Sequence, residues 1–335
     1  MERNLSEEQR KRYDHLIGEF EHVNRIWYYG EKHPHLPELI CAAWRVGVEL
    51  ITVNERETDH FLDALRGLKP PDAIFIAENA ENAENAERLL DRIAMDRLQS
   101  WRAQPSAVQE AGAVAVSICT SGSTGEPKVV QLSLDNILAF MLAWEDKLPW
   151  REAEVFAAIA HPAFDVGLAE LVFPLWKGWE TRFLTKEDLS EAEAINRAFR
   201  DVTAFHLVPA LLENWIEQKS PDAVGRIVMT GGDKVPQYLQ RNLHKKFETA
   251  RLFQFYGPSE CSFFTSGLEN SGGFHEGLLP LGTEFAHGQN DIVGAYLQPM
   301  PPFEAGEIVI SGLAVGMGYA GDADQGRFIE FQKAR

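Results

Sequence analysis

Short apolar runs alternate with helix-length segments through most of this sequence, and this alternation limits the folds that the chain can adopt. The runs are rich in β-branched and aromatic residues, which favours strands. Parallel strands need a crossover between them, and a helix usually supplies it, so the alternation predicts parallel α/β units. We expect strands at 26–29, 48–53, 73–76, 114–118, 129–132, 155–159, 182–184, 203–207, 226–230 and 251–255.

Helical segments lie between these runs. Pro37 suits the first turn of a helix over 37–44, and Ser133 is a suitable N-cap for another that begins at Leu134. Residues 78–86 repeat Glu-Asn-Ala three times, which indicates the solvated start of a helix or, alternatively, a regulatory insert. The remaining helices are expected at 1–24, 62–65, 166–176, 192–199, 210–216 and 236–247.

Glycine and proline become dense after residue 267, and helical patterns stop there. Further strands are expected at 291–293 and 307–311. The sequence therefore predicts three parts, namely a first α/β subdomain at 1–110, a second α/β subdomain with a polar loop and a substrate pocket at 111–267, and a β-rich subdomain at 268–335.

The acidic balance of the chain excludes some partners. Its 335 residues carry a formal net charge of −18, which repels nucleic acid phosphates and anionic membranes, so neither is an expected partner. The N-terminal stretch is charged, and no apolar run approaches the length of a membrane span. Cys41, Cys119 and Cys261 are too widely spaced for a zinc or disulfide pattern, which fits a reducing cytoplasm.

A polar loop, TSGSTGEPK at 120–128, separates two of the expected strands. Gly122 and Gly125 permit tight turns that bring backbone N–H groups close to an anion, and Lys128 adds a positive charge. These parts suit a polyphosphate, although a polar surface hairpin would have the same composition. No lysine directly follows a glycine, so the loop does not match the Walker pattern.

The loop resembles the phosphate loop of the adenylate-forming superfamily, which includes acyl-CoA ligases, luciferase-like enzymes and the adenylation domains of nonribosomal peptide synthetases. Val129 departs from the family pattern, which usually has glycine after the Pro-Lys pair. The resemblance implies ATP as the nucleotide, with Thr120 and Lys128 as catalytic residues. It also implies phosphate binding by Thr120, Ser121, Gly122, Ser123, Thr124, Gly125 and Lys128.

A second motif, RLFQFYGPSE at 251–260, resembles the family's Tyr-Gly-Pro-Thr-Glu, with Ser259 as a mild departure. The resemblance implies that Tyr256 stacks on adenine, that Ser259 binds phosphate, and that Glu260 is both catalytic and a ligand of Mg²⁺. An aromatic face suits a purine, and carboxylate oxygens suit Mg²⁺ that bridges phosphates. The structural alternative is a core tyrosine and a surface carboxylate.

The motif TGGDKV at 230–235 follows another expected strand, and its paired glycines let a flat ligand approach the backbone. The family usually has Gly-Gly-Glu here and uses this edge beside adenine, whereas a plain strand-to-helix turn is the structural alternative. By the same resemblance, the nucleotide-binding set also includes Gly231, Gly232, Asp233, Phe255 and Gly257.

The stretch HPAFDVGLAE at 161–170 resembles the amino-acid-activating branch, in which Phe-Asp opens the first pocket helix. The resemblance implies that Asp165 pairs with the α-ammonium group of the substrate, whereas its alternative role is a helix N-cap. His161 either lies near the substrate carboxylate or satisfies local hydrogen bonds. The implied pocket is small and largely apolar, and comprises Phe164, Asp165, Val166, Ala169, His206, Met229, Gly231, Phe255, Phe263 and Phe264.

The resemblance covers residues 25–330 and implies the large N-terminal core of an adenylate-forming enzyme. Family members continue with an aspartate for the ribose, a hinge, and a mobile C-terminal domain whose lysine contacts the α-phosphate. We expect these parts to be absent here, so this chain alone should be nearly inactive.

The implied reaction is amino acid adenylation, which converts ATP and an amino acid to aminoacyl-AMP and pyrophosphate. The aminoacyl group would then load onto the phosphopantetheine arm of a carrier protein. One alternative is an acyl- or aryl-acid ligase of the same fold, which Asp165 opposes. The other is a non-catalytic nucleotide- or protein-binding scaffold, which the polar loop and Glu260 oppose.

Overall fold

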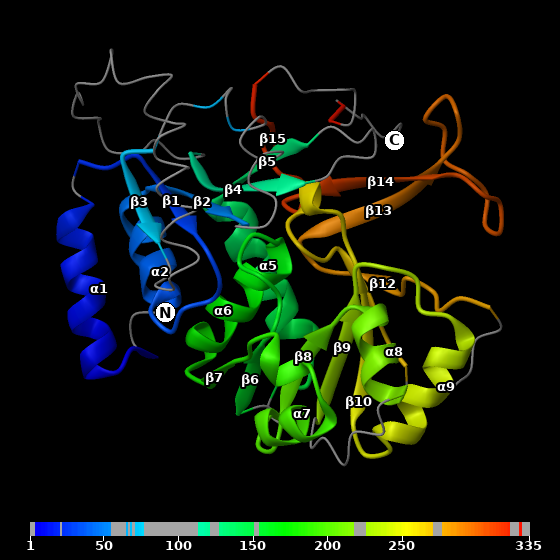
Figure 1. Ribbon diagram of the computed structural model, residues 1–335. Helices are drawn as coiled ribbons and strands as arrows, with labels where there is room; N and C mark the ends of the chain where they lie inside the picture. The colour runs from blue at the N-terminus through cyan, green and yellow to red at the C-terminus, as the bar shows by residue number, and fades with distance from the viewer. Residues whose placement is uncertain are drawn as a thin grey trace.

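Two sheets with helices between and around them form the protein in the computed structural model (Figure 1). The structure describes residues 4–20, 22–54, 65, 68, 71–76, 113–120, 127–150, 154–217, 226–270, 277–321 and 328–329. The Glu-Asn-Ala repeat, most of the helix expected at 62–65, and residues 121–126 of the polar loop lie outside this part. Among the described helices, none has both the length and the apolar character of a membrane span.

The first sheet has six strands, parallel at one end and antiparallel at the other. In order across the sheet, the strands are β15 (Gly318–Tyr319), β5 (Lys128–Ser133), β4 (Val114–Thr120), β2 (Glu49–Val53), β1 (Arg25–Tyr29) and β3 (Ala73–Ile76). The polar loop connects two neighbouring antiparallel strands, β4 and β5, and their register places Thr120 opposite Lys128.

The second sheet has seven strands. In order, they are β12 (Thr283–Glu284), β11 (Ser266–Glu269), β10 (Arg251–Tyr256), β9 (Ile227–Gly231), β8 (Ala204–Leu207), β6 (Val155–Ala158) and β7 (Glu180–Phe183). Like the first sheet, it is parallel at one end, and two antiparallel strands, β11 and β12, complete it at the other. A separate antiparallel pair is formed by β13 (Gly288–Val293) and β14 (Glu307–Gly312).

Helices fill the space between the sheets and cover the outer face of the second one. Figure 1 shows α5 and α6 between the sheets, and α8 and α9 on the far side of the seven-stranded sheet. The helices are α1 (Glu7–Glu19), α2 (Leu36–Val46), α5 (Leu134–Lys147), α6 (Asp165–Lys177), α7 (Ala192–Ala198), α8 (Pro209–Glu217) and α9 (Gln237–Lys246), with short 3₁₀ turns η3 (Glu187–Leu189) and η4 (Ser259–Cys261).

Local sequence explains where several helices begin and end. The Ser133 hydroxyl accepts a hydrogen bond from the Asn136 backbone N–H at 3.2 Å, and the Asn136 side chain accepts one from Ser133 N–H at 2.9 Å, which caps α5 as expected. Pro37 lies in the first turn of α2. Helix α6 ends at Gly178, whose φ of 73° favours glycine.

The predicted α/β class is confirmed, and the expected elements within the described residues match the structure to within a few residues at most ends. The exception is α1, which is shorter than the expected 1–24. The sheets do not follow the expected boundaries at residues 110 and 267. Strands β4 and β5 complete the first sheet, β11 and β12 extend the second, and β15 returns to the first. The division into three subdomains stays a prediction.

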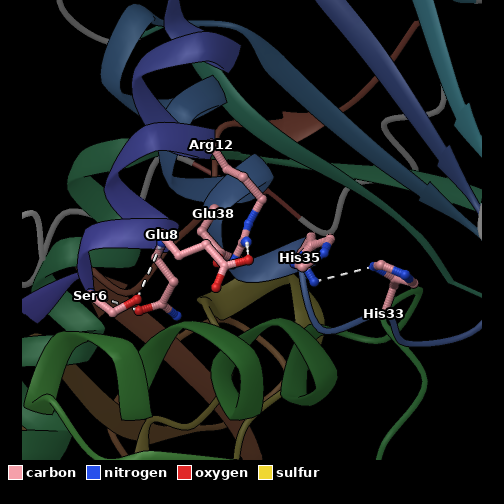
Figure 2. Close-up of polar contacts among 7 residues, drawn as sticks. Ser6, Glu8, Arg12, His33, His35 and Glu38 are labelled. Atoms are coloured by element: carbon pink, nitrogen blue, oxygen red, sulfur yellow. Dashed lines mark hydrogen bonds and ion pairs between the residues drawn. The ribbon is translucent and has the colours of Figure 1, made fainter.

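Helix α1 is anchored to α2 by a charge that is buried in the fold. Glu38 on α2 has a side chain only 1% exposed, and Arg12 on α1 contacts it at 3.0 Å (Figure 2). Arg12 also contacts Glu8 on its own helix, and Ser6 caps the start of that helix. A carboxylate at this depth needs a partner, because an unpaired buried charge is strongly destabilising.

We expect Arg12→Ala to lower the free energy of unfolding by about 3 kcal/mol, because it leaves the Glu38 carboxylate buried without its cation. The matched control is Arg182→Ala. Arg182 is about as exposed as Arg12, but its partner Glu180 is exposed. This substitution should lower the free energy of unfolding by less than about 1 kcal/mol. Urea unfolding measures both. Adding Glu38→Gln to Arg12→Ala should restore part of the loss, and equal costs for the two arginines would contradict this account.

Candidate functional site

The chemically distinctive residues gather at one edge of the seven-stranded sheet. Strands β6, β8, β9 and β10 are parallel, so their carboxyl ends share an edge, where ligands commonly bind in α/β folds. The chain continues from three of these ends into predicted site segments, which are His161 to Asp165 after β6, Gly232 and Asp233 after β9, and Gly257 to Glu260 after β10. On β8 the predicted site residue is His206, which lies within the strand.

Glu260 and Lys128 come from distant segments and meet at Tyr319. The Tyr319 hydroxyl donates a hydrogen bond to Glu260 Oε1 at 2.5 Å. The Lys128 ammonium lies 5.0 Å from the centre of the Tyr319 ring, and this lysine is buried at 4% exposure. The structure thus brings two residues predicted as catalytic around one tyrosine, for which the sequence indicated only a structural role in the β-rich subdomain.

Asp165 lies beside this cluster, at the start of α6. It is the first residue of the helix, and the N-cap position belongs to Phe164, which makes no side-chain capping bond. Asp165 Oδ1 accepts a hydrogen bond from the Val166 N–H at 2.7 Å, and its carboxylate also accepts one from the Ser259 side chain. Burial raises the pKa of Asp165, these hydrogen bonds oppose the shift, and the nearby charge of Glu260 adds to it.

The predicted pocket residues mostly share one buried cluster on the inner face of the second sheet. The Phe264 ring lies 5.5 Å from the His206 ring and 5.0 Å from the Phe255 ring. Met229 pairs with His206 across β8 and β9, and Ala169 is buried in the same cluster while Val166 packs against it. Phe263 packs on α5, with its ring 4.6 Å from Phe140.

Two of the predicted glycines are required by packing. A Cβ on Gly231 would lie 2.7 Å from the Phe255 carbonyl oxygen, and one on Gly257 would lie 2.2 Å from the Phe263 carbonyl oxygen. Both distances exclude any side chain, so the close approach of backbone segments explains these residues.

The remaining predicted site residues are not part of this buried cluster. Phe164 is exposed, and the His161 Nδ1 accepts a hydrogen bond from the Ala163 N–H at 3.0 Å, which satisfies it locally. Tyr256 is half-buried, and burial raises the pKa of its hydroxyl. Asp233 is exposed and accepts a hydrogen bond from the Lys234 N–H at 2.7 Å. The predicted phosphate ligands from Ser121 to Gly125 lie outside the described residues.

Glu170 is a buried polar residue that sequence reasoning missed. One oxygen accepts hydrogen bonds from Ile159 N–H at 2.5 Å and Ala160 N–H at 2.7 Å, and the other lies 3.8 Å from His206 Nδ1. Burial raises the pKa of Glu170 to about 7 and lowers that of His206 to about 4. In the sequence, a glutamate inside the otherwise apolar run of α6 was the feature that could have indicated a buried carboxylate.

The opposite shifts of Glu170 and His206 predict a specific pH dependence. The pKa of Glu170 is raised above its ordinary 4.5, so its stabilising contribution is full below that value and is lost as pH rises through about 7. The pKa of His206 is lowered from 6.5, so its contribution is full above that value and is lost as pH falls through about 4. The two contributions oppose each other between these limits.

Glu170→Gln removes the glutamate contribution, so the pH dependence of stability that comes from His206 should become measurable. Between pH 6.5 and pH 4 we expect the variant to lose stability more steeply than the unsubstituted protein, by roughly 1–3 kcal/mol, when measured by denaturant unfolding across pH. In His206→Gln only the Glu170 contribution remains, so the free energy of unfolding should stay level or rise as the pH falls from 6.5 to 4. Parallel profiles for all three proteins would show that these two groups do not titrate as the geometry indicates.

Among the described residues, no three or more His, Cys, Asp or Glu side chains converge on one metal position. A magnesium ion that accompanies a nucleotide does not need such a cluster, because one or two carboxylates, phosphate oxygens and water complete its shell. Glu260 beside Asp165 supplies carboxylates of this kind.

Comparisons with known proteins place this geometry in context. The model of the family described as AMP-binding enzyme matches residues 16–320. A dimodular nonribosomal peptide synthase of Bacillus subtilis (strain 168) is 28% identical over 207 residues, which cover 61% of this chain and 9% of that protein. A D-alanine–D-alanyl carrier protein ligase of Bacillus licheniformis is 28% identical over 215 residues, covering 61% and 42%. The chain thus spans less than half the length of these curated relatives.

Solved structures share the fold at low identity. PA1221, a protein containing adenylation and PCP domains, superposes with a TM-score of 0.74 at 19% identity, covering 95% of this chain and 56% of that one. The Klebsiella oxytoca NpsA N-terminal subdomain gives 0.73 at 22% identity, covering 96% and 84%. The Vibrio cholerae adenylation domain AlmE gives 0.74 at 19% identity, covering 94% and 65%. With the family match spanning nearly all of its length and this fold in common, the chain belongs to the AMP-binding enzyme family, as its resemblance to adenylate-forming enzymes predicted.

Proposed function

We propose that this chain is the nucleotide- and substrate-binding core of an enzyme that adenylates an amino acid. The carboxylate of the amino acid would attack the α-phosphorus of ATP, giving aminoacyl-AMP and releasing pyrophosphate. The aminoacyl group would then pass to the phosphopantetheine arm of a carrier protein. The observation that carries the proposal is that Tyr319 contacts both Lys128 and Glu260, while the charge of Glu260 acts on the neighbouring Asp165.

The positive and negative groups around Tyr319 suit a metal–nucleotide complex. Lys128 is a buried cation at the end of the polar loop and would neutralise phosphate charge. Glu260 would hold Mg²⁺, because its charge already disfavours ionisation of neighbouring Asp165 and a hard cation would relieve that repulsion. When bound, Mg²⁺ would withdraw charge from the phosphates. The half-buried Tyr256, at the end of β10, would offer an aromatic face for the adenine.

Asp165 supports an amino acid rather than a simple acid. Its carboxylate is held by the Val166 N–H and the Ser259 side chain, yet burial raises its pKa, so its ionised form lacks full compensation. An α-ammonium group would supply that compensation through a charge-assisted hydrogen bond. The relatives named for nonribosomal peptide synthesis and for a D-alanyl carrier protein point the same way.

The buried side chains among the predicted pocket residues favour a small, neutral amino acid. Met229, Phe255 and Phe264 are each at most 5% exposed, and the Phe264 ring lies against the rings of His206 and Phe255. Such a packed set leaves little room for a large substrate side chain. We therefore propose a small neutral amino acid, with either configuration at its α-carbon.

An acyl- or aryl-acid ligase is the second candidate function. The Klebsiella oxytoca NpsA N-terminal subdomain, which shares the fold, is described in complex with 3-hydroxybenzoyl-AMSN, whose aryl group carries no amino group. Asp165 argues against this candidate, because an acid without an amino group leaves the carboxylate uncompensated.

Nucleotide binding is the first test of the proposal. We expect isothermal titration calorimetry to show ATP binding that Mg²⁺ strengthens. Lys128→Met should weaken ATP binding by about 10-fold or more through loss of a charge-assisted contact. Lys11→Met is the control, since Lys11 is an exposed lysine on α1 and should change nothing. Absence of binding at millimolar ATP would favour a non-catalytic scaffold.

Substrate class is tested by substituting Asp165. Asp165→Asn should weaken binding of a non-hydrolysable aminoacyl-adenylate analogue by about 10-fold or more, since a charged hydrogen bond contributes about 1.5–3 kcal/mol. The matched control is Asp135→Asn, because Asp135 lies in the first turn of α5 and is exposed. ATP affinity should stay unchanged in both.

The same titration separates the two ligase candidates. An analogue without the amino group should bind the unsubstituted protein weakly and be indifferent to Asp165→Asn. Tighter binding of the amino-free analogue would support the acyl- or aryl-acid ligase instead.

A further inference from the structure

Tyr319 reaches the site from a strand far along the chain. Strand β15 pairs antiparallel with β5, with Tyr319 opposite Val130. Backbone bonds hold it on both sides, because Met317 N–H donates to the Gln131 oxygen at 2.8 Å and Ala320 N–H donates to the Val129 oxygen at 2.8 Å. The short segment is therefore anchored on β5 without the help of the tyrosine hydroxyl.

A second anchor ties the same segment to the other sheet. The Gly316 N–H donates to the Glu260 backbone oxygen at 2.8 Å. A Cβ on Gly316 would lie 3.0 Å from that oxygen, so the approach is close. Residues 316–320 thus join the first turn after β10 to the strand that begins at Lys128.

The Tyr319 side chain contacts two charged groups of the site at once. Its hydroxyl donates to Glu260 Oε1 at 2.5 Å, a length typical of bonds to an ionised carboxylate. Its ring lies 5.0 Å from Lys128 Nζ, within reach of a cation–π interaction. The Phe328 ring lies edge-on at 5.2 Å and restricts the tyrosine ring. The tyrosine is 9% exposed, so both contacts are shielded from water.

We propose that Tyr319 is a positioning residue, which orients the Glu260 carboxylate for Mg²⁺ and the Lys128 ammonium for the nucleotide phosphates. This inference rests on the proposed function. By taking one carboxylate oxygen, the hydroxyl fixes the group while leaving the other oxygen for a cation. Hydrogen-bonded partners of this kind orient metal-ligating carboxylates, and their loss typically lowers metal affinity by about 10- to 100-fold.

The hydroxyl and the ring have separable roles, so two substitutions are needed. Tyr319→Phe removes the hydroxyl and its bond to Glu260 but keeps the ring. It should raise the Mg²⁺ concentration for half-maximal enhancement of ATP binding by about 10-fold or more, while ATP affinity in EDTA changes by less than about 2-fold. Tyr319→Leu also removes the ring beside Lys128, and should weaken ATP binding in EDTA by about 3- to 10-fold.

The control is Tyr28→Phe. Tyr28 is also a buried tyrosine of the first sheet, and its hydroxyl donates to the Glu31 backbone oxygen at 2.7 Å. Its loss should reduce stability without moving the Mg²⁺ midpoint. Thermal unfolding of every variant shows that the comparison is made on folded protein. A Mg²⁺ midpoint that shifts equally for Tyr28→Phe and Tyr319→Phe would overturn the inference.

A double-mutant cycle tests whether Tyr319 acts through Glu260. In a Glu260→Gln background, Tyr319→Phe should change the Mg²⁺ midpoint by less than about 2-fold, because the metal-binding carboxylate is already gone. Additive shifts in the cycle would overturn the inference and leave nucleotide binding intact. Failure of the unsubstituted chain to bind ATP at all is a different result, since it would overturn the proposed function and this inference together.

Discussion

The positions of the site residues depend on one aromatic layer between the two sheets. Phe140 and Trp144 on α5 are fully buried. The Trp144 ring lies 4.5 Å from that of Phe173 on α6, and the Phe140 ring lies 4.6 Å from that of Phe263, beyond β10. Truncating a buried aromatic of this kind typically costs about 3–5 kcal/mol. Because the layer touches strands of both sheets, its packing sets how far β4 and β5 lie from β8 to β10.

Two buried polar residues, Glu170 and His206, lie beside this apolar layer near the carboxyl ends of β6 and β8. Glu170 is fully buried, and two backbone N–H groups of the turn after β6 satisfy one of its oxygens. His206 lies beside it with an unpaired Nε2, and burial keeps the imidazole neutral near pH 7 by lowering its pKa to about 4. Buried groups left partly unsatisfied are costly, so a fold that is optimised for stability alone would replace them.

The sequence predicted what depends on local pattern and missed what depends on distant pairing. Alternating apolar runs determine strands and helices locally, so the elements from β1 to β10 within the described residues, and the cap of α5 by Ser133, were predictable. Asp165 was offered as an N-cap because aspartate favours that position, but the helix begins one residue earlier, so Phe164 takes it. No local pattern reveals that Glu170 approaches His206, or that the hydroxyl of Tyr319 meets Glu260, 59 residues away in sequence.

The segment after residue 267 is more closely involved in the site than its loop-rich composition indicates. Strands β11 and β12 extend the second sheet, while β15 completes the first, so this segment connects the two sheets. Its backbone is bonded to Glu260 through Gly316 and to β5 through Met317 and Ala320. Any rotation of one sheet against the other would strain these bonds and change the separation of Lys128 from Glu260. The segment therefore restricts the relative motion of a cation and a carboxylate that, in the proposed function, face the same phosphates. In this way a loop-rich region far along the chain would preorganise charge at the proposed site.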